Sequence, residues 1–297
     1  MRAGIVILPV DRWSRAAEWW RWADEVGFDS AWTYDHLSWR SFREQSWFGA
    51  VTTLTAAAAV TQRIRLGTMV TSPNFRHPVT LAKDVMGIDD VSDGRFTLGV
   101  GAGGTGFDAT TLGQRQWSAR ERADRFAEFV ELTDRLLRTD ATTYEGHFYS
   151  ADEARMIPGC VQTPRVPFAI AATGPRGLRL AARHGQAWVT YGDPKRAGEL
   201  PVEDCPGVVA GQLGRLADEC AAAGRDVKEL DRILLTGSTR ERPLESVDAF
   251  VDFAGRYAEA GITDLLVHRP IADSPFATDP AVFERIASEG LAQIRDL

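Results

Sequence analysis

Short apolar runs alternate with longer amphipathic stretches along the whole chain. The short runs are rich in β-branched residues, which is typical of buried strands. In the stretches between them, apolar residues recur three and four positions apart, which predicts helices that bury one face. The pattern therefore predicts a repeated strand–helix unit with eight strands. The expected strands cover residues 3–8, 30–34, 64–70, 95–100, 168–172, 187–191, 232–235 and 264–268.

Two of the helical stretches carry recognisable boundaries. Ser118 and Glu121 have the spacing of a capping box, ahead of apolar residues that keep helical spacing over 126–137. A later helix is expected over 247–258, and Gly261 follows it as a stop signal. Both stretches are long enough to cross a domain and to return the chain to the start of the next strand.

Alternating strands and helices build either a closed barrel or an open doubly wound sheet. The open sheet usually has a glycine-rich turn after its first strand, whereas this chain reads Leu-Pro-Val-Asp at 8–11. We therefore expect an α/β fold, a single-domain (β/α)8 TIM barrel over residues 1–297. It has long insertions at 101–117, after strand four, and at 139–165, before strand five, the latter with a hairpin at 144–149. Loops of this length usually serve a function.

Composition narrows the class of protein. Hydrophobic residues make up 44% of the chain and charged residues 25%, which is ordinary for a soluble domain. The formal net charge of −7 argues against a nucleic-acid-binding protein, because such proteins need a basic face. No apolar run approaches the ~20 residues of a membrane span, so we expect a cytoplasmic protein that does not enter the membrane.

Several kinds of catalytic site have no support in the sequence. The three cysteines are far apart and form no CxxC pair. The chain has no HxH or HExxH motif, so no metal site is expected. The serine-hydrolase motif GxSxG and the Walker loop are also absent. The chemistry is therefore expected to come from an organic cofactor or from the substrate.

His36 is the leading candidate for catalysis. It follows Asp35 at the end of the second expected strand, and the active sites of these barrels lie at the carboxyl ends of the strands. Histidine titrates near neutral pH and can donate or accept a proton. A lone histidine is otherwise a structural residue, but its place at a strand end favours a functional one.

Two further strand ends have features of a cofactor site. Gly101, Gly103 and Gly104 follow strand four, where backbone without Cβ atoms lets a flat ligand approach closely. After strand five, 173–175 reads Thr-Gly-Pro and opens a helix, whose free N–H groups bind phosphate well. Arg176 is adjacent and adds positive charge. A plain turn and an ordinary helix cap are the alternatives.

Taken together, these segments resemble the luciferase-like monooxygenase superfamily. The resemblance covers most of residues 1–190, and beyond that only the strand–helix rhythm continues. The motifs are weak singly and specific in combination. They are GFDSAW at 27–32 with DH at 35–36, IRLGT at 64–68 with SP at 72–73, RHP at 76–78, LAK at 81–83, SDGRF at 92–96, GAG at 101–103, AATGP at 171–175 and AARHG at 181–185.

The resemblance implies a (β/α)8 barrel that binds FMN or the deazaflavin coenzyme F420 at its C-terminal rim. It implies that His36 lies near the cofactor ring, and that Met69 and Val70 are joined by a cis peptide bond behind it. Gly104 departs from relatives that carry a glutamate there as a proton donor. The cofactor-binding residues expected on this basis are Asp35, His36, Met69, Val70, Ser72, Ala102, Gly103, Gly104, Thr173, Gly174 and Arg176.

Three functions follow from the resemblance. The first is a coenzyme F420-dependent oxidoreductase that transfers hydride to or from a small organic substrate, with His36 stabilising charge or moving a proton. The second is an FMN-dependent monooxygenase supplied with reduced flavin by a separate reductase. The third is a non-catalytic flavin-binding subunit. A flavin or F420 reductase is a possible partner.

The substrate and the oligomeric state depend on less specific features. Trp19 and Trp22 fall outside the apolar stripe of the first helix, which indicates either a homodimer interface, as is common in the family, or coverage by loops of the same chain. Aromatic and apolar residues in the two insertions indicate an apolar substrate, unless they only pack the loops. These residues are Phe107, Trp117, Tyr144, Phe148, Tyr149 and Met156.

Overall fold

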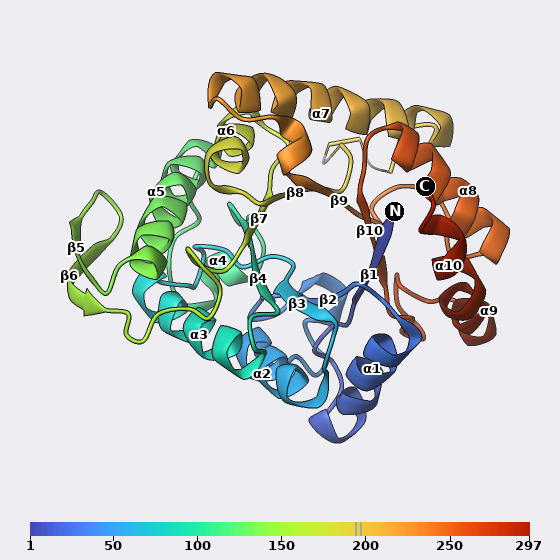
Figure 1. Cartoon of the computed structure of the whole chain (residues 1–297), viewed down its shortest axis with the longest axis horizontal. Helices are drawn as coiled ribbons and strands as arrows, with labels where there is room; N and C mark the ends of the chain where they lie inside the picture. The colour runs from blue at the N-terminus through green and yellow to red at the C-terminus, as the bar shows by residue number, and fades with distance from the viewer. Residues whose placement is uncertain (194, 197) are drawn as a thin grey trace.

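Eight parallel strands close into a barrel in the order β1-β10-β9-β8-β7-β4-β3-β2 (Figure 1). The structure is a computed structural model that describes residues 1–193, 195–196 and 198–297. Each barrel strand coincides within two or three residues with an expected one, so the predicted (β/α)8 barrel is confirmed. The barrel strands are β1 (Arg2–Val6), β2 (Ser30–Thr33), β3 (Arg65–Thr68), β4 (Phe96–Gly101), β7 (Phe168–Ala171), β8 (Ala187–Thr190), β9 (Asp231–Leu235) and β10 (Asp264–His268).

Helices surround the barrel and return the chain from the end of one strand to the start of the next (Figure 1). The capping box at Ser118 is present, with Glu121 bonded back to it, and the later helix ends just before Gly261, as expected. The helices are α1 (Trp13–Val26), α2 (Ala50–Val60), α3 (Pro78–Val91), α4 (Asp108–Thr111), α5 (Ala119–Arg138), α6 (Pro175–His184), α7 (Cys205–Ala222), α8 (Val247–Glu259), α9 (Pro280–Arg285) and α10 (Leu291–Ile294).

Strand β3 is shorter than expected, ending at Thr68 instead of residue 70. The peptide bond between Met69 and Val70 is cis, as the resemblance implied, and the chain leaves the strand ladder there. Pairing with β4 resumes at one position, an isolated bridge between Thr71 and Val100. The end of β3 is therefore a bulge at the barrel rim.

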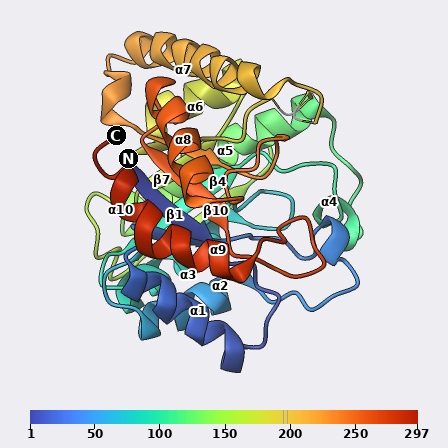
Figure 2. The same ribbon diagram turned by 90° about the vertical axis from the view of Figure 1, so that its right-hand side faces the viewer.

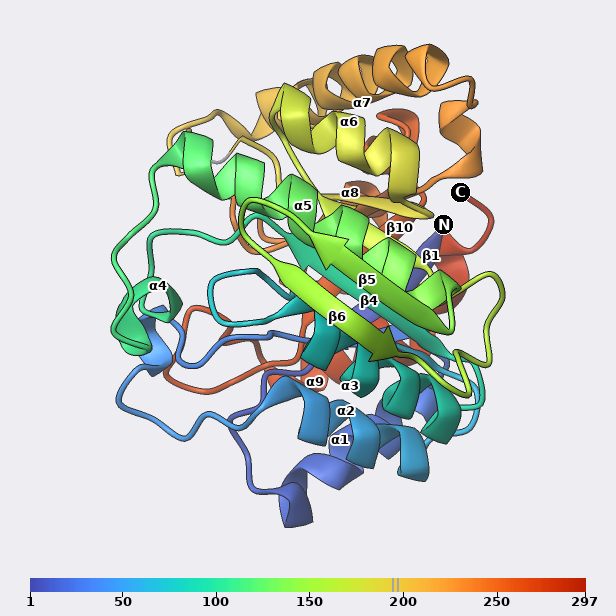
Figure 3. The ribbon, with the colours of Figure 1, turned by 90° about the vertical axis from the view of Figure 1, so that its left-hand side faces the viewer.

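The second insertion forms a hairpin of strands β5 (Ala141–Glu145) and β6 (Ser150–Arg155), which lies across the outer face of α5 (Figure 3). Its turn is fixed by Glu128 of α5, whose carboxylate accepts the backbone N–H groups of residues 147–149 at 2.8–3.1 Å. One half-buried carboxylate thus accepts three donors that the tight turn leaves without strand partners.

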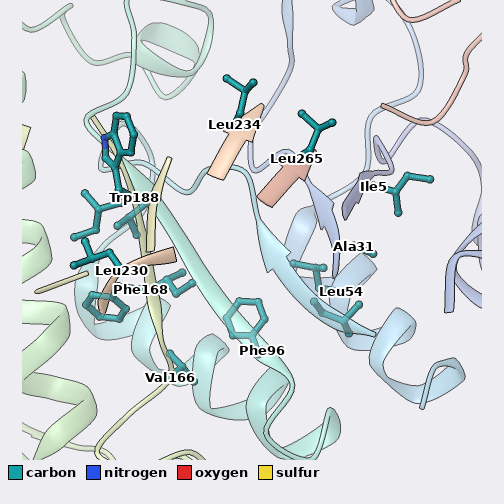
Figure 4. Close-up of a cluster of buried hydrophobic side chains, with 14 of the residues drawn as sticks. Ile5, Ala31, Leu54, Phe96, Val166, Phe168, Trp188, Leu230, Leu234 and Leu265 are labelled. Atoms are coloured by element: carbon teal, nitrogen blue, oxygen red, sulfur yellow. The ribbon is translucent and has the colours of Figure 1, made fainter. Parts of the chain in front are cut away.

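Side chains alternate between two apolar cores along each strand. One core fills the space between barrel and helices and includes Ile5, Leu54, Phe96 and Leu265 (Figure 4). The other consists of the alternate residues and fills the barrel interior, where it includes Val6, Trp32, Tyr34, Met69, Val189, Ile233 and Leu266. Side chains at positions two apart on a strand point the same way, so the last inward-facing residues of the strands form the floor of the barrel mouth.

The mouth is at the end of the barrel opposite to the two termini, where α4 also lies (Figure 2). The tryptophan pair of α1 is half-buried within the chain: Trp19 and Trp22 pack edge to face at 5.6 Å, and Trp22 contacts Phe283 of α9 at 5.7 Å. Contacts in the chain thus account for part of this apolar surface. In the described part of the chain, no helix is both long and apolar enough to cross a bilayer.

Candidate functional site

His36 lies at the barrel mouth, just after β2, and is held by a carboxylate from the first insertion. Its Nδ1 is hydrogen-bonded to Oδ2 of Asp108, at the start of α4, and the two side chains are 28% and 5% exposed. An ionised carboxylate accepts the hydrogen of Nδ1, which leaves Nε2 with its lone pair. No hydrogen bond to Nε2 is found among the described residues. This nitrogen can therefore accept a proton from a molecule in the mouth.

The same carboxylate fastens the two loops together. The other oxygen of Asp108 accepts the backbone N–H of Leu37 at 2.7 Å. The Arg43 guanidinium lies over the ring of Phe107, 4.2 Å from its centroid. On the other side, Trp47 donates its indole N–H to the carbonyl oxygen of His36 at 2.8 Å. The imidazole is thus fixed in position by both loops before any ligand binds.

Asp35 is 1% exposed, and both of its oxygens are already occupied. Arg76 donates to them from Nε at 3.0 Å and from Nη2 at 2.7 Å, and the Thr71 hydroxyl donates at 2.8 Å. Burial works against the charge of Arg76, but the hydrogen bond to Asp35 keeps its pKa above the ordinary value. The structure therefore places Asp35 below the surface of the mouth, as a clamp on the β3–α3 loop.

Glycines make the bulge at the end of β3 possible. A Cβ at Gly99 would lie 1.8 Å from the carbonyl oxygen of Thr68, and one at Gly101 would lie 2.7 Å from the Val70 side chain. Gly103 has a φ of +73°, and a Cβ there would meet Asn74 at 2.8 Å. These close approaches leave Ala102 and Gly103 on a smooth, half-buried backbone surface beside the bulge.

Gly104 differs from Gly99, Gly101 and Gly103. It is exposed, and the nearest heavy atom to an added Cβ is 3.9 Å away. A side chain therefore fits at Gly104, and none is there. The expectation that this position supplies no acid holds, but the site does have an acid, because Asp108 reaches His36 four residues further on.

Ser72 and the start of α6 provide hydrogen-bonding groups that the described part of the chain leaves without partners. Ser72 is 3% exposed, and its buried Oγ has no hydrogen-bond partner among the residues that the structure describes. Helix α6 begins at Pro175 with Gly174 as its cap, as expected, and no side chain of the described residues caps it. Arg176, in contrast, pairs with Asp124 of α5. Its charge is therefore partly compensated, which sequence reasoning did not foresee.

An aromatic wall covers one side of the mouth. Tyr34 lies edge to face against His36 at 5.9 Å and against Trp39 at 5.2 Å. Phe276, from the loop after β10, stacks on Trp39 at 5.8 Å and on His268 at 3.9 Å. This cluster joins residues more than two hundred positions apart, so sequence reasoning missed it.

Several aromatic and apolar residues of the insertions pack against each other or against the core of the domain. Trp117 and Phe148 meet edge to face at 5.7 Å, and Tyr149 lies 6.0 Å from Phe129 of α5. Met156 is 2% exposed and belongs to the core between barrel and helices. These residues therefore do not indicate an apolar substrate. The aromatic wall of Tyr34, Trp39 and Phe276 is the better indication of one.

The comparisons with known proteins agree with the fold and with the motifs. A family model described as luciferase-like monooxygenase matches residues 1–261, well beyond the part in which the motifs were recognised. A solved F420-dependent secondary alcohol dehydrogenase, in complex with an F420-acetone adduct, has a TM-score of 0.79 over 100% of both chains. At 19% identity, this likeness shows the fold alone.

Two curated relatives carry different activities. The F420-dependent glucose-6-phosphate dehydrogenase of Beutenbergia cavernae is 31% identical across 92% of this chain and 91% of that protein. The 4-hydroxyprotoasukamycin monooxygenase of Streptomyces nodosus is 32% identical across 80% of this chain. That match spans 62% of the monooxygenase, so this chain corresponds to less than two thirds of its length.

Proposed function

This chain belongs to the luciferase-like monooxygenase family and is an oxidoreductase of that family; within it, we propose that it uses coenzyme F420 to transfer hydride to or from a small organic substrate. The observation that carries the proposal is the hydrogen bond that holds His36 to Asp108 at the barrel mouth. A preset proton acceptor beside a binding surface suits the oxidation or reduction of a carbon–oxygen centre, because such a reaction moves a proton together with the hydride.

The residues at the mouth fit a flat cofactor with a phosphate group. The bulge and the glycine loop form a surface of backbone, because a side chain at Gly101 or Gly103 would collide with its neighbours. The buried Ser72 hydroxyl has no hydrogen-bond partner among the described residues and is available to a ligand. The uncapped start of α6, after Thr173 and Gly174, has free N–H groups for the phosphate.

The bound cofactor would supply the hydride chemistry, and the chain would supply orientation and proton handling. Met69, Val70 and Ala102 would support the ring, and Thr173 and Gly174 would bind the phosphate. His36 would accept or return the substrate proton at Nε2, while Asp108 holds Nδ1 and stabilises the imidazolium. Asp35 and Gly104 would act indirectly, by shaping the loops around the ring.

The choice of F420 rests on the curated relatives. The dehydrogenase of Beutenbergia cavernae, which is matched over 91% of its length, is F420-dependent, and so is a hydroxymycolic acid dehydrogenase of Mycobacterium tuberculosis that is 29% identical. A small organic substrate with an apolar part would suit the wall of Tyr34, Trp39 and Phe276. We propose a homodimer that works in the cytoplasm and exchanges its cofactor with an F420 reductase.

An FMN-dependent monooxygenase is the second candidate. Two observations favour it: a monooxygenase is among the relatives, and Gly104 carries no acidic side chain. In that case a flavin reductase would be the partner. A non-catalytic flavin-binding subunit is a weaker third candidate, because it would have no use for the His36–Asp108 pair.

Fluorescence titration with F420 and with FMN separates these functions. Micromolar binding of F420 and much weaker binding of FMN is the expected result, and binding of FMN alone would overturn the proposal. A His36→Gln variant then tests catalysis, since it should bind F420 as the parent does and lose turnover. A variant that turned over normally would reduce His36 to a structural residue.

A further inference from the structure

A second histidine, His268, lies at the floor of the barrel mouth and is used by nothing described so far. It is the last residue of β10, in the inward-facing register of Leu266, and it is 4% exposed. Its Nε2 lies 2.9 Å from the hydroxyl oxygen of Tyr34. Phe276 covers one face of the ring at 3.9 Å with an interplanar angle of 15°. The imidazole is therefore fixed on two sides.

The hydrogen bond with Tyr34 determines which nitrogen of His268 carries the hydrogen. If Nε2 donated to the hydroxyl oxygen, the hydrogen of that hydroxyl would need another acceptor. None is found among the described residues, and the charged group that faces Tyr34 is Arg40, which has only donors. A buried hydroxyl hydrogen without an acceptor is costly. Tyr34 therefore donates to Nε2, and neutral His268 carries its hydrogen on Nδ1.

The neutral form is also the one that burial favours. Desolvation in the barrel interior lowers the pKa of His268 to about 3, and no charged side chain among the described residues compensates for it. The same desolvation raises the pKa of Tyr34, which keeps its hydroxyl protonated. The pair thus stays neutral at the pH values at which a cytoplasmic protein works.

The Nδ1 edge of His268 lies beside a glycine. The neighbouring residue on that side is Gly237, just after β9, which is exposed and has a φ of +93°. A Cβ there would lie 3.5 Å from Nδ1. No hydrogen bond to Nδ1 is found in the described part of the chain. The missing Cβ of Gly237 thus leaves room beside a fixed donor.

We propose that the Nδ1–H group of His268, set by Tyr34, binds an oxygen atom of the substrate and so selects carbonyl compounds and alcohols. The substrate class rests on the proposed function, since it places the substrate in this mouth beside His36. His268 is then a specificity-determining residue and Tyr34 a positioning residue. A hydrocarbon would leave the donor without an acceptor, and sites built in this way discriminate strongly against such analogues.

Nitrogen-15 NMR of the histidine side chains tests the tautomer without any ligand. The chain has five histidines, and the signal lost in His268→Gln identifies the one of interest. We expect Nδ1 in the protonated range and Nε2 in the unprotonated range. In Tyr34→Phe we expect a mixture of the two neutral forms. A wild-type protein with the hydrogen on Nε2 would overturn the proposal, even if the Tyr34 variant failed to fold.

Cyclohexanone, cyclohexanol and cyclohexane then test the substrate class, because they share size and differ in the oxygen. The ketone and the alcohol should shift the Nδ1–H proton of His268 saturably, and the hydrocarbon should not. Equal shifts with all three, or none with the oxygen compounds, would overturn the selection of oxygen. Neither measurement uses a cofactor. If F420 failed to bind, the fluorescence titration would show it, and the two NMR results would be unaffected.

Discussion

Asp108 is hydrogen-bonded to Nδ1 of His36 across 72 residues of sequence, and it holds the loop of His36 through the N–H of Leu37 as well. One carboxylate therefore sets both the orientation of the imidazole and the closure of two rim loops. The arrangement gives His36 an acidic partner even though Gly104 carries none. It also makes Asp108 the clearest point at which to test whether the pair acts in catalysis.

Replacing Asp108 by asparagine should lower turnover by about 10²–10⁴-fold, the usual contribution of a positioned acid or base. The amide retains an acceptor for Leu37 but does not stabilise the imidazolium. We expect unchanged F420 binding, and nitrogen-15 NMR should show His36 losing its preference for hydrogen on Nδ1. Asp252→Asn, at a 70% exposed side chain on α8, is the matched control. Equal turnover in the two variants would remove Asp108 from the mechanism.

Alanine at two glycines of the same region should have opposite outcomes. Gly99→Ala places a Cβ 1.8 Å from the Thr68 carbonyl oxygen, so the bulge must move. We expect the free energy of unfolding to fall by more than ~3 kcal/mol, or the protein not to fold. Gly104→Ala meets nothing closer than 3.9 Å and should change stability by less than ~1 kcal/mol. Urea denaturation measures both. A tolerated Gly99→Ala would contradict the tight packing of the bulge.

The buried pair of Asp35 and Arg76 should be costly to break. Asp35→Asn leaves the guanidinium, which is 19% exposed, with the more distant carboxylate of Asp84 at 3.7 Å, so we expect the free energy of unfolding to fall by ~3 kcal/mol. Combining it with Arg76→Met should recover much of that loss, because no guanidinium is then left without its main counter-charge. A double-mutant cycle by urea denaturation gives the coupling. Additive effects would show that the two side chains do not depend on each other.

Acid should destabilise the fold through His268. Its pKa is about 3 in the folded chain and near 6.5 when unfolded, so between these values the unfolded chain binds the extra proton. The contribution of His268 to the free energy of unfolding is fully present above pH 6.5. It falls as the pH drops, and at pH 4.5 it has decreased by ~2–3 kcal/mol. His268→Gln should remove that part of the pH dependence. Parallel stability curves for the two proteins, measured by urea denaturation, would contradict the burial of a neutral histidine.

The tip of the hairpin should depend on Glu128. Glu128→Gln replaces one acceptor oxygen by an NH₂ group and removes the charge that the N–H groups of residues 147–149 share. We expect the free energy of unfolding to fall by ~1–2 kcal/mol and hydrogen exchange at those three amides to become faster. Glu145→Gln, on exposed strand β5, is the control. Unaltered exchange at the tip would mean that the turn holds its shape without the carboxylate.

Much of the fold was predictable because periodicity is a local property. The strand runs and the helical spacing identified all eight barrel strands, and the capping signal at Ser118 placed the start of α5. The glycine loop and the start of α6 were recognisable because their backbone demands leave a mark on residue type. The end of β3 was placed too late, since the chain leaves the ladder at Met69 while its residues still look like a strand.

The partners of the candidate residues were not predictable in the same way. Nothing in the sequence distinguishes Asp108 from other acids near a loop, or joins His268 to Tyr34, because these contacts cross 72 and 234 positions. The sequence by itself determined the barrel, its rim and the place of His36 on that rim. The tertiary structure alone decided that Asp35 is buried, that Asp108 faces His36 and that Tyr34 meets His268. Barrel closure brings distant strand ends together, and side-chain contacts across the rim leave no periodic trace along the chain.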